Sequence, residues 1–340
     1  MCRAESEGGR RCPCSSTEAS REAHNARRRR NRAIRTAVVS WARAKGVPDE
    51  ALSVLAAAAP SIAKGWAENA GASASVLEAP PARVGKPLPV VDAFWATSEL
   101  VDAIAAIARL QGRTGAELRL LEGDADRVDW PDDSGVNDTR RVWLVNGSEG
   151  YHKSFDGLDD DCADEFGQVP GLQPVHEVGA WILARGLGAP WDAMVPECVL
   201  RPVEGRLGSF ARAVPGGVGP LFSGVRPELI AAAGFFDALI GQQDRHLGNL
   251  LVDGDQLRLI DHGFTFAVPG DTYNVAALHK YRFDQDPMLS GDELKALKKL
   301  VKSPDLFGLE GMLEQGRADA VRDRARAMLR SGCLPVVGEF

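Results

Sequence analysis

Residues 241–266 read GQQDRHLGNLLVDGDQLRLIDHGFTF, and this stretch decides which fold the chain can adopt. Inside it, two short apolar runs lie on either side of the turn residues Asp253 and Gly254, a pattern that predicts a β-hairpin. The hairpin would bring Asn249, just before its first strand, close to Asp261, just after its second. The sequence therefore predicts an amide and a carboxylate held together at the base of one rigid hairpin.

These side chains have the chemistry that phosphoryl transfer requires. That reaction needs a carboxylate that orients or deprotonates the attacking hydroxyl, and hard oxygen ligands for a metal that neutralises the phosphates. Asp244 can serve as the carboxylate, while Asn249 and Asp261 can share a Mg²⁺ ion. Because Asp, Asn and Gly are also common in solvated turns, the spacing of Asp244 and Asn249 alone is a weak signal. The hairpin and the Asp-His-Gly sequence that follows it make the combined pattern specific.

The same residues resemble the catalytic loop of kinases, which reads D-x4-N and is followed by D-x-G. Ordinary protein kinases and aminoglycoside-type phosphotransferases carry a His two residues before the Asp, where this chain has Gln242, and here His246 follows Asp244 instead. The order D-R-H-x-x-N with a later I-D-H-G is similar to that of the phosphatidylinositol 3/4-kinase and HipA-like branch of the protein-kinase-like fold. The run from Phe236 to His246 also resembles the F-D-x-L-I-G-N-x-D-R-H sequence of HipA-like kinases, with Gln242 where Asn is common.

The resemblance implies a bilobal α+β fold, with a small β-rich N-lobe and a mostly helical C-lobe, that uses ATP and Mg²⁺. Catalytic roles would fall on Asp244, Asn249, Asp261 and Lys153, with Asn249 and Asp261 as the Mg²⁺ ligands. Lys153 is expected on the third strand, where it would hold the nucleotide phosphates. Glu177, 24 residues later in the first turn of a predicted helix, resembles the glutamate that fixes this lysine. The alternatives are a surface lysine in an edge strand and a glutamate that only complements the helix dipole.

Loops are predicted to complete the nucleotide site. A polar loop that includes Ser134 and Asn137 precedes the lysine-bearing hairpin and could offer hydrogen-bond donors to phosphate oxygens. It lacks the G-x-G-x-x-G fingerprint of many nucleotide-covering loops. Before this loop, Glu117–Glu122 is predicted as a short strand. Ala213 and Val214 follow the last predicted strand of the N-lobe, and the resemblance places them in the hinge whose backbone contacts adenine.

Three residues near the predicted site have open or secondary roles. Arg245 is interpreted as the ion-pair partner of a buried carboxylate. His246 either packs under Asp261 in the core or touches the γ-phosphate of ATP. His262 is expected to pack the Asp-His-Gly turn rather than bind a metal.

Composition restricts the class of protein. The chain has 340 residues, of which 44% are hydrophobic and 26% charged, as in ordinary globular proteins. No apolar run reaches the roughly 18–20 residues of a membrane span, and the N-terminus lacks the apolar segment of a secretory signal, so a cytoplasmic location is expected. Six Cys do not form a disulfide framework, and the Cys12-Pro13-Cys14 spacing matches no common zinc module.

Charge is unevenly distributed along the chain. Residues 1–50 hold twelve Lys and Arg against six Asp and Glu, a net of +6, so the remainder has a net charge of −13. An acidic body argues against nucleic acid as the partner of the catalytic part. The basic run Arg27–Arg30 could contact nucleic acid or an acidic partner, or could simply be a solvated tail.

The chain divides into five predicted parts. They are a disordered basic arm at 1–32, a small helical region at 33–72, a linker at 73–96, the N-lobe at 97–215 and the helical C-lobe at 216–340. Within the C-lobe, apolar periodicity predicts helices at 228–240, 291–302 and about 308–330. The stretch 265–290 is where an acceptor substrate would be recognised.

These observations lead us to expect an ATP/Mg²⁺-dependent phosphotransferase, a kinase that acts on a protein Ser/Thr as HipA-like kinases do. A small-molecule or inositol-lipid kinase, a pseudokinase that binds nucleotide without turnover, and a nucleotidyl transferase remain as alternatives. The expected partners are ATP and a protein or small-molecule acceptor, with no membrane span.

Overall fold

The structure is a computed structural model that describes part of the 340-residue chain. The described residues are 102–130, 139–155, 166–168, 172–204, 206–218, 224–273 and 275–337, together with Val39, Arg43 and Leu52. The predicted basic arm and linker lie outside them, as do the predicted phosphate-binding residues Ser134 and Asn137. Of the predicted helical region at 33–72, only Val39, Arg43 and Leu52 are described. Within the described ranges, no helix is long and apolar enough to cross a membrane.

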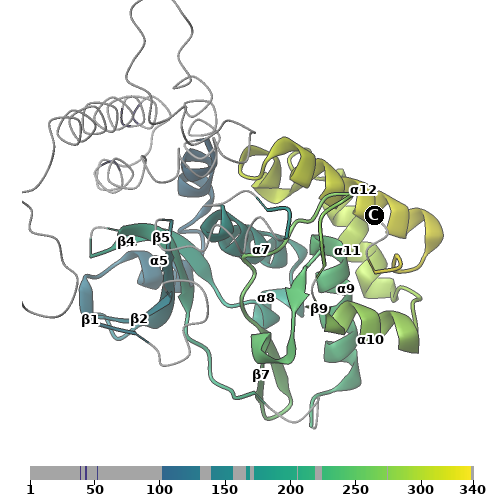
Figure 1. Cartoon of the computed structure of the whole chain (residues 1–340), viewed down its shortest axis with the longest axis horizontal. Helices are drawn as coiled ribbons and strands as arrows, with labels where there is room; N and C mark the ends of the chain where they lie inside the picture. The colour runs from purple at the N-terminus through teal and green to yellow at the C-terminus, as the bar shows by residue number, and fades with distance from the viewer. Residues whose placement is uncertain are drawn as a thin grey trace, which may run out of the picture.

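A five-stranded antiparallel sheet forms the first part of the described chain (Figure 1, left). Its order is β1-β2-β3-β5-β4, and the strands are β1 (Ala125–Asp129), β2 (Thr139–Leu144), β3 (Glu149–Ser154), β4 (Cys198–Val203) and β5 (Arg206–Arg212). One face packs against helix α5 (Gly115–Leu121) through an apolar cluster that includes Leu120 and Phe210. On β3, Lys153 is paired in register with Ser209 of β5. As predicted from the sequence, Lys153 therefore lies on the third strand.

Helix α5 corrects the prediction of a strand at Glu117–Glu122. The Thr114 hydroxyl accepts a hydrogen bond from the Glu117 N–H at 3.1 Å, and the Glu117 carboxylate accepts one from the Thr114 N–H at 3.0 Å. This reciprocal capping box starts a helix. Glu117 is fully buried, and its carboxylate also accepts from Trp181 Nε1 at 2.6 Å and pairs with Arg185. The strand prediction was wrong because the Thr-x-x-Glu signal, supported by a distant helix, outweighs a short apolar run.

Helix α7 (Gln173–Leu187) connects β3 to β4, together with the short helix α8 (Trp191–Met194). In Figure 1 it lies between the sheet and the C-terminal helices, and nearly all of its residues are buried. Gly179 permits its close packing, because a Cβ atom there would lie 3.1 Å from both Met312 and Phe266. Met312 and Phe266 therefore limit how α7 can be placed.

The second part of the chain is mostly helical (Figure 1, right). It contains α9 (Pro227–Ile240), α10 (Ala277–Gln285), α11 (Gly291–Lys302) and α12 (Gln315–Ser331). The predicted helices at 228–240 and 291–302 are confirmed. The helix predicted at about 308–330 is instead divided into a 3₁₀ segment, η3 (Leu306–Gly311), and α12. The helix is interrupted between the two segments at Glu314, whose ψ of 141° is not helical. Phe307 and Gly308, with positive φ angles of 62° and 104°, also distort the backbone inside η3.

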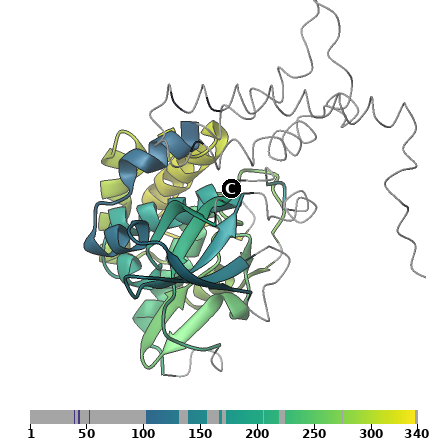
Figure 2. The same cartoon turned by 90° about the vertical axis from the view of Figure 1, so that its left-hand side faces the viewer.

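The two parts share one core. A single buried apolar cluster contains residues of α7, of the strands and of α9 to α12, and it includes Leu52. Two perpendicular views show the helix at 102–110 (blue) beside the C-terminal segment (yellow) (Figure 1 and Figure 2). The described chain thus has the predicted α+β class, with a sheet-rich part followed by a helical part.

Candidate active site

The predicted hairpin forms and brings its two ends together. Strands β7 (Leu250–Asp253) and β8 (Gln256–Leu259) pair antiparallel, with Gly254 at a φ of 62° in the turn. At the open end, the N–H of Ile260 donates to the carbonyl of Asn249 at 3.1 Å. Asn249 and Asp261 therefore stand at the base of the hairpin, as the sequence predicts.

The loop before the hairpin is fixed by its own backbone. Strand β6 (Asp244–Arg245) pairs in parallel with β9 (Val275–Ala276), and the 3₁₀ turn η2 (Leu247–Asn249) follows. The Asn249 side-chain amide donates to the Asp244 carbonyl at 3.0 Å. Asn249 thus closes the loop that begins at Asp244, and the two residues lie on one short, ordered segment.

A buried ion pair between Arg245 and Asp237 connects this loop to helix α9. Arg245 Nε lies 3.0 Å from an oxygen of Asp237 on α9, and both side chains are almost fully buried, at 0% and 1% exposure. Arg245 also donates to the carbonyls of Asn249 at 3.1 Å and Ile260 at 2.6 Å. These contacts agree with the interpretation of Arg245 as a structural partner of a buried carboxylate. One guanidinium therefore joins α9, the loop and the base of the hairpin.

Lys153 lies between two carboxylates. Its Nζ atom is 2.6 Å from Glu177 Oε1 and 2.7 Å from Asp261 Oδ1. Burial alone would lower the pKa of Lys153, but Asp261 and Glu177 together raise it above its usual value. Burial would likewise raise the pKa of Asp261, yet the Lys153 ammonium more than offsets this and lowers it. Lys153 and Asp261 are therefore both charged at neutral pH.

The turn after β8 is shaped around Glu177. Asp261 has a φ of 57°, a left-handed conformation that is uncommon outside glycine and carries backbone strain. The N–H of His262 donates to Glu177 Oε2 at 3.0 Å, so Glu177 holds both Lys153 and this turn. The His262 ring is buried and lies edge-on to Phe236 with the ring centres 6.3 Å apart. Burial lowers the pKa of His262, so the ring is neutral, in agreement with the packing role expected for it.

These groups open into a cleft of about 970 Å³ between the sheet and the hairpin. Lys153, Glu177, Asn249 and Asp261 line it. So do apolar side chains from both sides, which are Val195, Ala211, Val214, Leu251 and Ile260. Of the two residues predicted for the hinge, Val214 lies on the cleft wall, whereas Ala213 uses its N–H to bond the Glu149 carbonyl at 2.8 Å. The Ala213 N–H is therefore bonded within the protein, and Ala213 is not among the described residues that line the cleft.

His246 does not pack in the core, which removes one of the two roles considered for it. Its side chain is exposed and lies on the cleft wall. Nδ1 accepts a hydrogen bond from the Gly248 N–H at 3.0 Å, while Nε2 lies 4.0 Å from an Asp244 oxygen. The imidazole of His246 thus lies on the wall of the cleft, with Nδ1 bonded to the Gly248 N–H.

The outer cleft wall contains residues that the sequence analysis missed. Arg127, Arg141, Trp143 and Tyr151 line the cleft from β1, β2 and β3. The guanidinium of Arg127 lies 3.6 Å from the centre of a Trp143 ring. Alternation along the strands could have placed Tyr151 on the same face as Lys153, because residues two apart share a face. Their gathering depends on the register between strands, which no local pattern specifies.

The donor set fits Mg²⁺ only in part. Asn249 and Asp261 supply an amide and a carboxylate, and hard oxygen ligands suit this ion. In the described part of the chain, no group of three or more His, Cys, Asp or Glu side chains could hold a metal. Mg²⁺ commonly binds through one or two protein ligands and completes its shell with phosphate oxygens and water. Asn249 and Asp261 therefore fit a metal that arrives with a nucleotide.

Comparison with known proteins gives little further information. The sequence matches no protein-family profile, and no curated protein matches it. Among solved structures, the chain is similar to a Helicobacter pylori proinflammatory kinase, CtkA, at 11% identity and a TM-score of 0.31. The match covers 59% of this chain and 92% of that one. A similarity this distant assigns no role to the residues of the cleft.

Proposed function

We propose that this protein is an ATP/Mg²⁺-dependent kinase that transfers the γ-phosphoryl group of ATP to the hydroxyl of a protein Ser or Thr. The observation that supports this best is the position of Lys153, within 2.7 Å of both Glu177 and Asp261 on a cleft wall that Asn249 shares. The cluster joins one cation, two carboxylates and an amide in a cleft that is open to solvent. These are the groups that a transferring phosphoryl requires.

Each residue has a separate task in this proposal. Lys153 binds the nucleotide phosphates, and Glu177 keeps its ammonium group in the cleft. Asn249 and Asp261 would hold Mg²⁺, which when bound neutralises charge on the phosphate oxygens. Asp244 orients the acceptor hydroxyl and takes its proton. The left-handed turn at Asp261 supports this arrangement, because it fixes the direction of the carboxylate before any ligand binds.

The apolar cleft walls suit a nucleobase. Val214 and Ala211 line the same cleft as Leu251 and Ile260. A flat ring between such walls removes apolar surface from water, which is the main favourable term for a base. Ser134 and Asn137, which lie outside the described residues, remain predicted phosphate-binding residues.

Protein labelling with γ-³²P-ATP and Mg²⁺ tests the proposal. The wild type is incubated alone and with candidate acceptor proteins, beside Asp244→Ala and Asp261→Asn. Asp253→Asn is the matched control, because this exposed residue lies at the other end of the same hairpin. We expect label transfer in the wild type and the control, and a loss of about 10²-fold or more in the two site variants.

Parallel reactions with α-³²P-ATP distinguish phosphoryl from nucleotidyl transfer. Label from the α-phosphate that appears on protein would replace the kinase assignment by nucleotidyl transfer. A wild type that binds ATP but transfers neither label would indicate a pseudokinase. Absence of ATP binding would overturn the proposal entirely.

A further inference from the structure

A buried histidine links the start of α12 to the turn that carries Asp261. His176 Nε2 lies 3.3 Å from Glu314 Oε2, and His176 Nδ1 lies 3.1 Å from the carbonyl oxygen of Gly263. His176 is fully buried, and Glu314 precedes the first residue of α12. A carbonyl and an ionised carboxylate can only accept hydrogen bonds. Both contacts are therefore satisfied together when both ring nitrogens of His176 donate.

The histidine is the direct neighbour of Glu177 near the start of α7. Glu177 binds Lys153 at 2.6 Å and the His262 N–H at 3.0 Å. One turn of helix thus carries the residue that holds Lys153 and the residue that contacts Glu314. A shift of this segment would therefore change both sets of contacts together.

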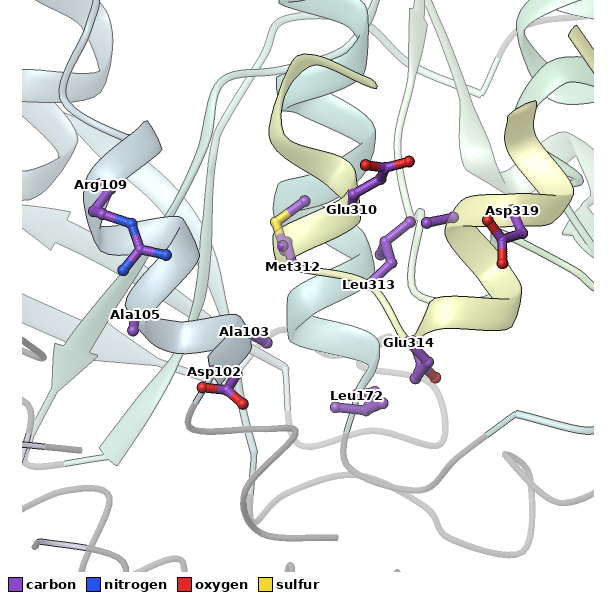
Figure 3. A pocket seen from close by; sticks show the side chains of 12 residues that line it. Asp102, Ala103, Ala105, Arg109, Leu172, Glu310, Met312, Leu313, Glu314 and Asp319 are labelled. Atoms are coloured by element: carbon purple, nitrogen blue, oxygen red, sulfur yellow. The ribbon is translucent and has the colours of Figure 1, made fainter. Parts of the chain in front are cut away.

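The far side of Glu314 is anchored as well. Its Oε1 atom lies 3.1 Å from Arg317 Nε, and Arg317 also contacts Asp271 at 2.8 Å and the Phe266 carbonyl at 3.0 Å. Glu314 stands on the wall of a second cavity, of about 700 Å³, beside Leu172 at the start of α7 (Figure 3). The carboxylate therefore connects a solvent-accessible cavity with the groups behind the cleft.

We propose that Glu314 is a positioning residue that acts through His176 to hold Glu177, and so sets how firmly Lys153 is held in the cleft. The inference deepens the proposed kinase function, because the geometry of the lysine pair would set the rate of transfer. Glu314 touches none of the reacting groups itself. Loss of its carboxylate removes the partner of His176 Nε2, frees the start of α7, and loosens the Lys153 contact.

Chemical labelling of Lys153 tests this without any need for turnover. The full chain is treated with limiting acetic anhydride, and acetylation of Lys153 is measured by mass spectrometry relative to the exposed Lys280. Glu314→Gln is compared with Asp319→Asn, which changes an exposed carboxylate on α12 that lines the same second cavity. We expect Lys153 to react about three- to tenfold faster in Glu314→Gln. The Asp319→Asn chain should react as the wild type does.

A second background separates positioning from a general loss of stability. In a Glu177→Gln chain, the proposed path from Glu314 to Lys153 is already broken. Adding Glu314→Gln should then change Lys153 labelling little further, because the two substitutions act on one path. Effects that simply multiply would show that Glu314 acts on stability alone. If Glu314→Gln does not fold by circular dichroism, His176→Gln takes its place, with the same expected result.

Turnover gives an independent reading. Where phosphoryl transfer is detected, Glu314→Gln should lower kcat while Asp319→Asn does not. A wild type without transfer would defeat the proposed function, yet the labelling result would still decide the positioning role. Unchanged Lys153 labelling in Glu314→Gln overturns the inference, whatever the activity.

Discussion

Two ion-paired clusters lie at the base of the same hairpin, and they differ in what can reach them. Arg245 and Asp237 form a matched pair, one cation with one anion, at 0% and 1% exposure. Lys153 faces two carboxylates, and its partner Asp261 is 39% exposed. The first cluster is closed to solvent and electrically balanced. The second is open and holds one more negative charge than positive.

The difference separates a structural role from a ligand-binding one. Removing one member of a closed pair leaves a charge that no solvent can reach, which is costly. The open cluster can exchange partners, because a phosphate oxygen can replace Asp261 at Lys153 while the carboxylate turns to a metal. Its spare negative charge suits a site whose cations arrive with the ligand.

The largest effect is expected from Asp237→Ala. The Arg245 guanidinium would remain buried with no anion, and the free energy of unfolding should fall by about 3–5 kcal/mol. Urea denaturation followed by circular dichroism measures this. Asp253→Asn, at the exposed end of the hairpin, is the control and should change little. A loss below about 1 kcal/mol would mean that water reaches the pair, and the contrast between the clusters would disappear.

Lys153→Met should lower activity more than stability. If the proposed function is correct, loss of the cation that binds the phosphates lowers kcat by about 10²–10³-fold. Fold stability should change less than in Asp237→Ala, because Asp261 can turn toward water. Steady-state kinetics and urea denaturation on the same preparation provide both numbers. A variant that unfolds as readily as Asp237→Ala would place Lys153 among the structural residues.

Local signals in the sequence predicted the contacts between residues that lie close together along the chain. The hairpin follows from two apolar runs and a Gly turn, so the proximity of Asn249 and Asp261 could be predicted. The contact between Lys153 and Glu177 was expected only from the family resemblance. No local pattern relates two residues that are 24 positions apart across a loop. Their catalytic roles stay predictions.

Contacts between distant residues could not be predicted. His176 and Glu314 are separated by 138 positions, and nothing in either neighbourhood indicates the other. Helix α5 has a local signal in its Thr114–Glu117 capping box, but the contacts of buried Glu117 with Trp181 and Arg185 of α7 depend on the tertiary fold. The exposure of His246 depends on the turn that its own ring caps. A sequence motif does not specify this geometry.

Acid should weaken the fold partly through Glu314. Burial would raise the pKa of its carboxyl, but His176 and Arg317 more than offset this and lower it to about 2, from an ordinary 4.5. The folded state therefore binds the proton less readily than the unfolded chain. The resulting stability, on the order of 3 kcal/mol, is present above pH 4.5 and lost as the pH falls toward 2.

Unfolding by urea at several pH values between 5 and 2.5 measures this dependence. Glu314→Gln should have a flatter acid limb than the wild type, although other carboxylates also titrate there. Asp319→Asn should reproduce the wild-type slope. Parallel wild-type and Glu314→Gln curves would show that the carboxylate contributes nothing through its ionisation.

The smallest change in the free energy of unfolding is expected at an exposed ion pair. Lys280 and Asp284 on α10 lie 3.0 Å apart, the same distance as Arg245 and Asp237, but their side chains are 69% and 52% exposed. Water and salt screen the exposed charges, so Lys280→Ala should change the free energy of unfolding by no more than about 0.5 kcal/mol. Urea denaturation at low and high salt measures it. Equal losses from Lys280→Ala and Asp237→Ala would mean that contact distance governs these pairs. The expected difference of about tenfold between them instead assigns the contribution to burial, and burial is what distinguishes the closed cluster under the hairpin from the open one in the cleft.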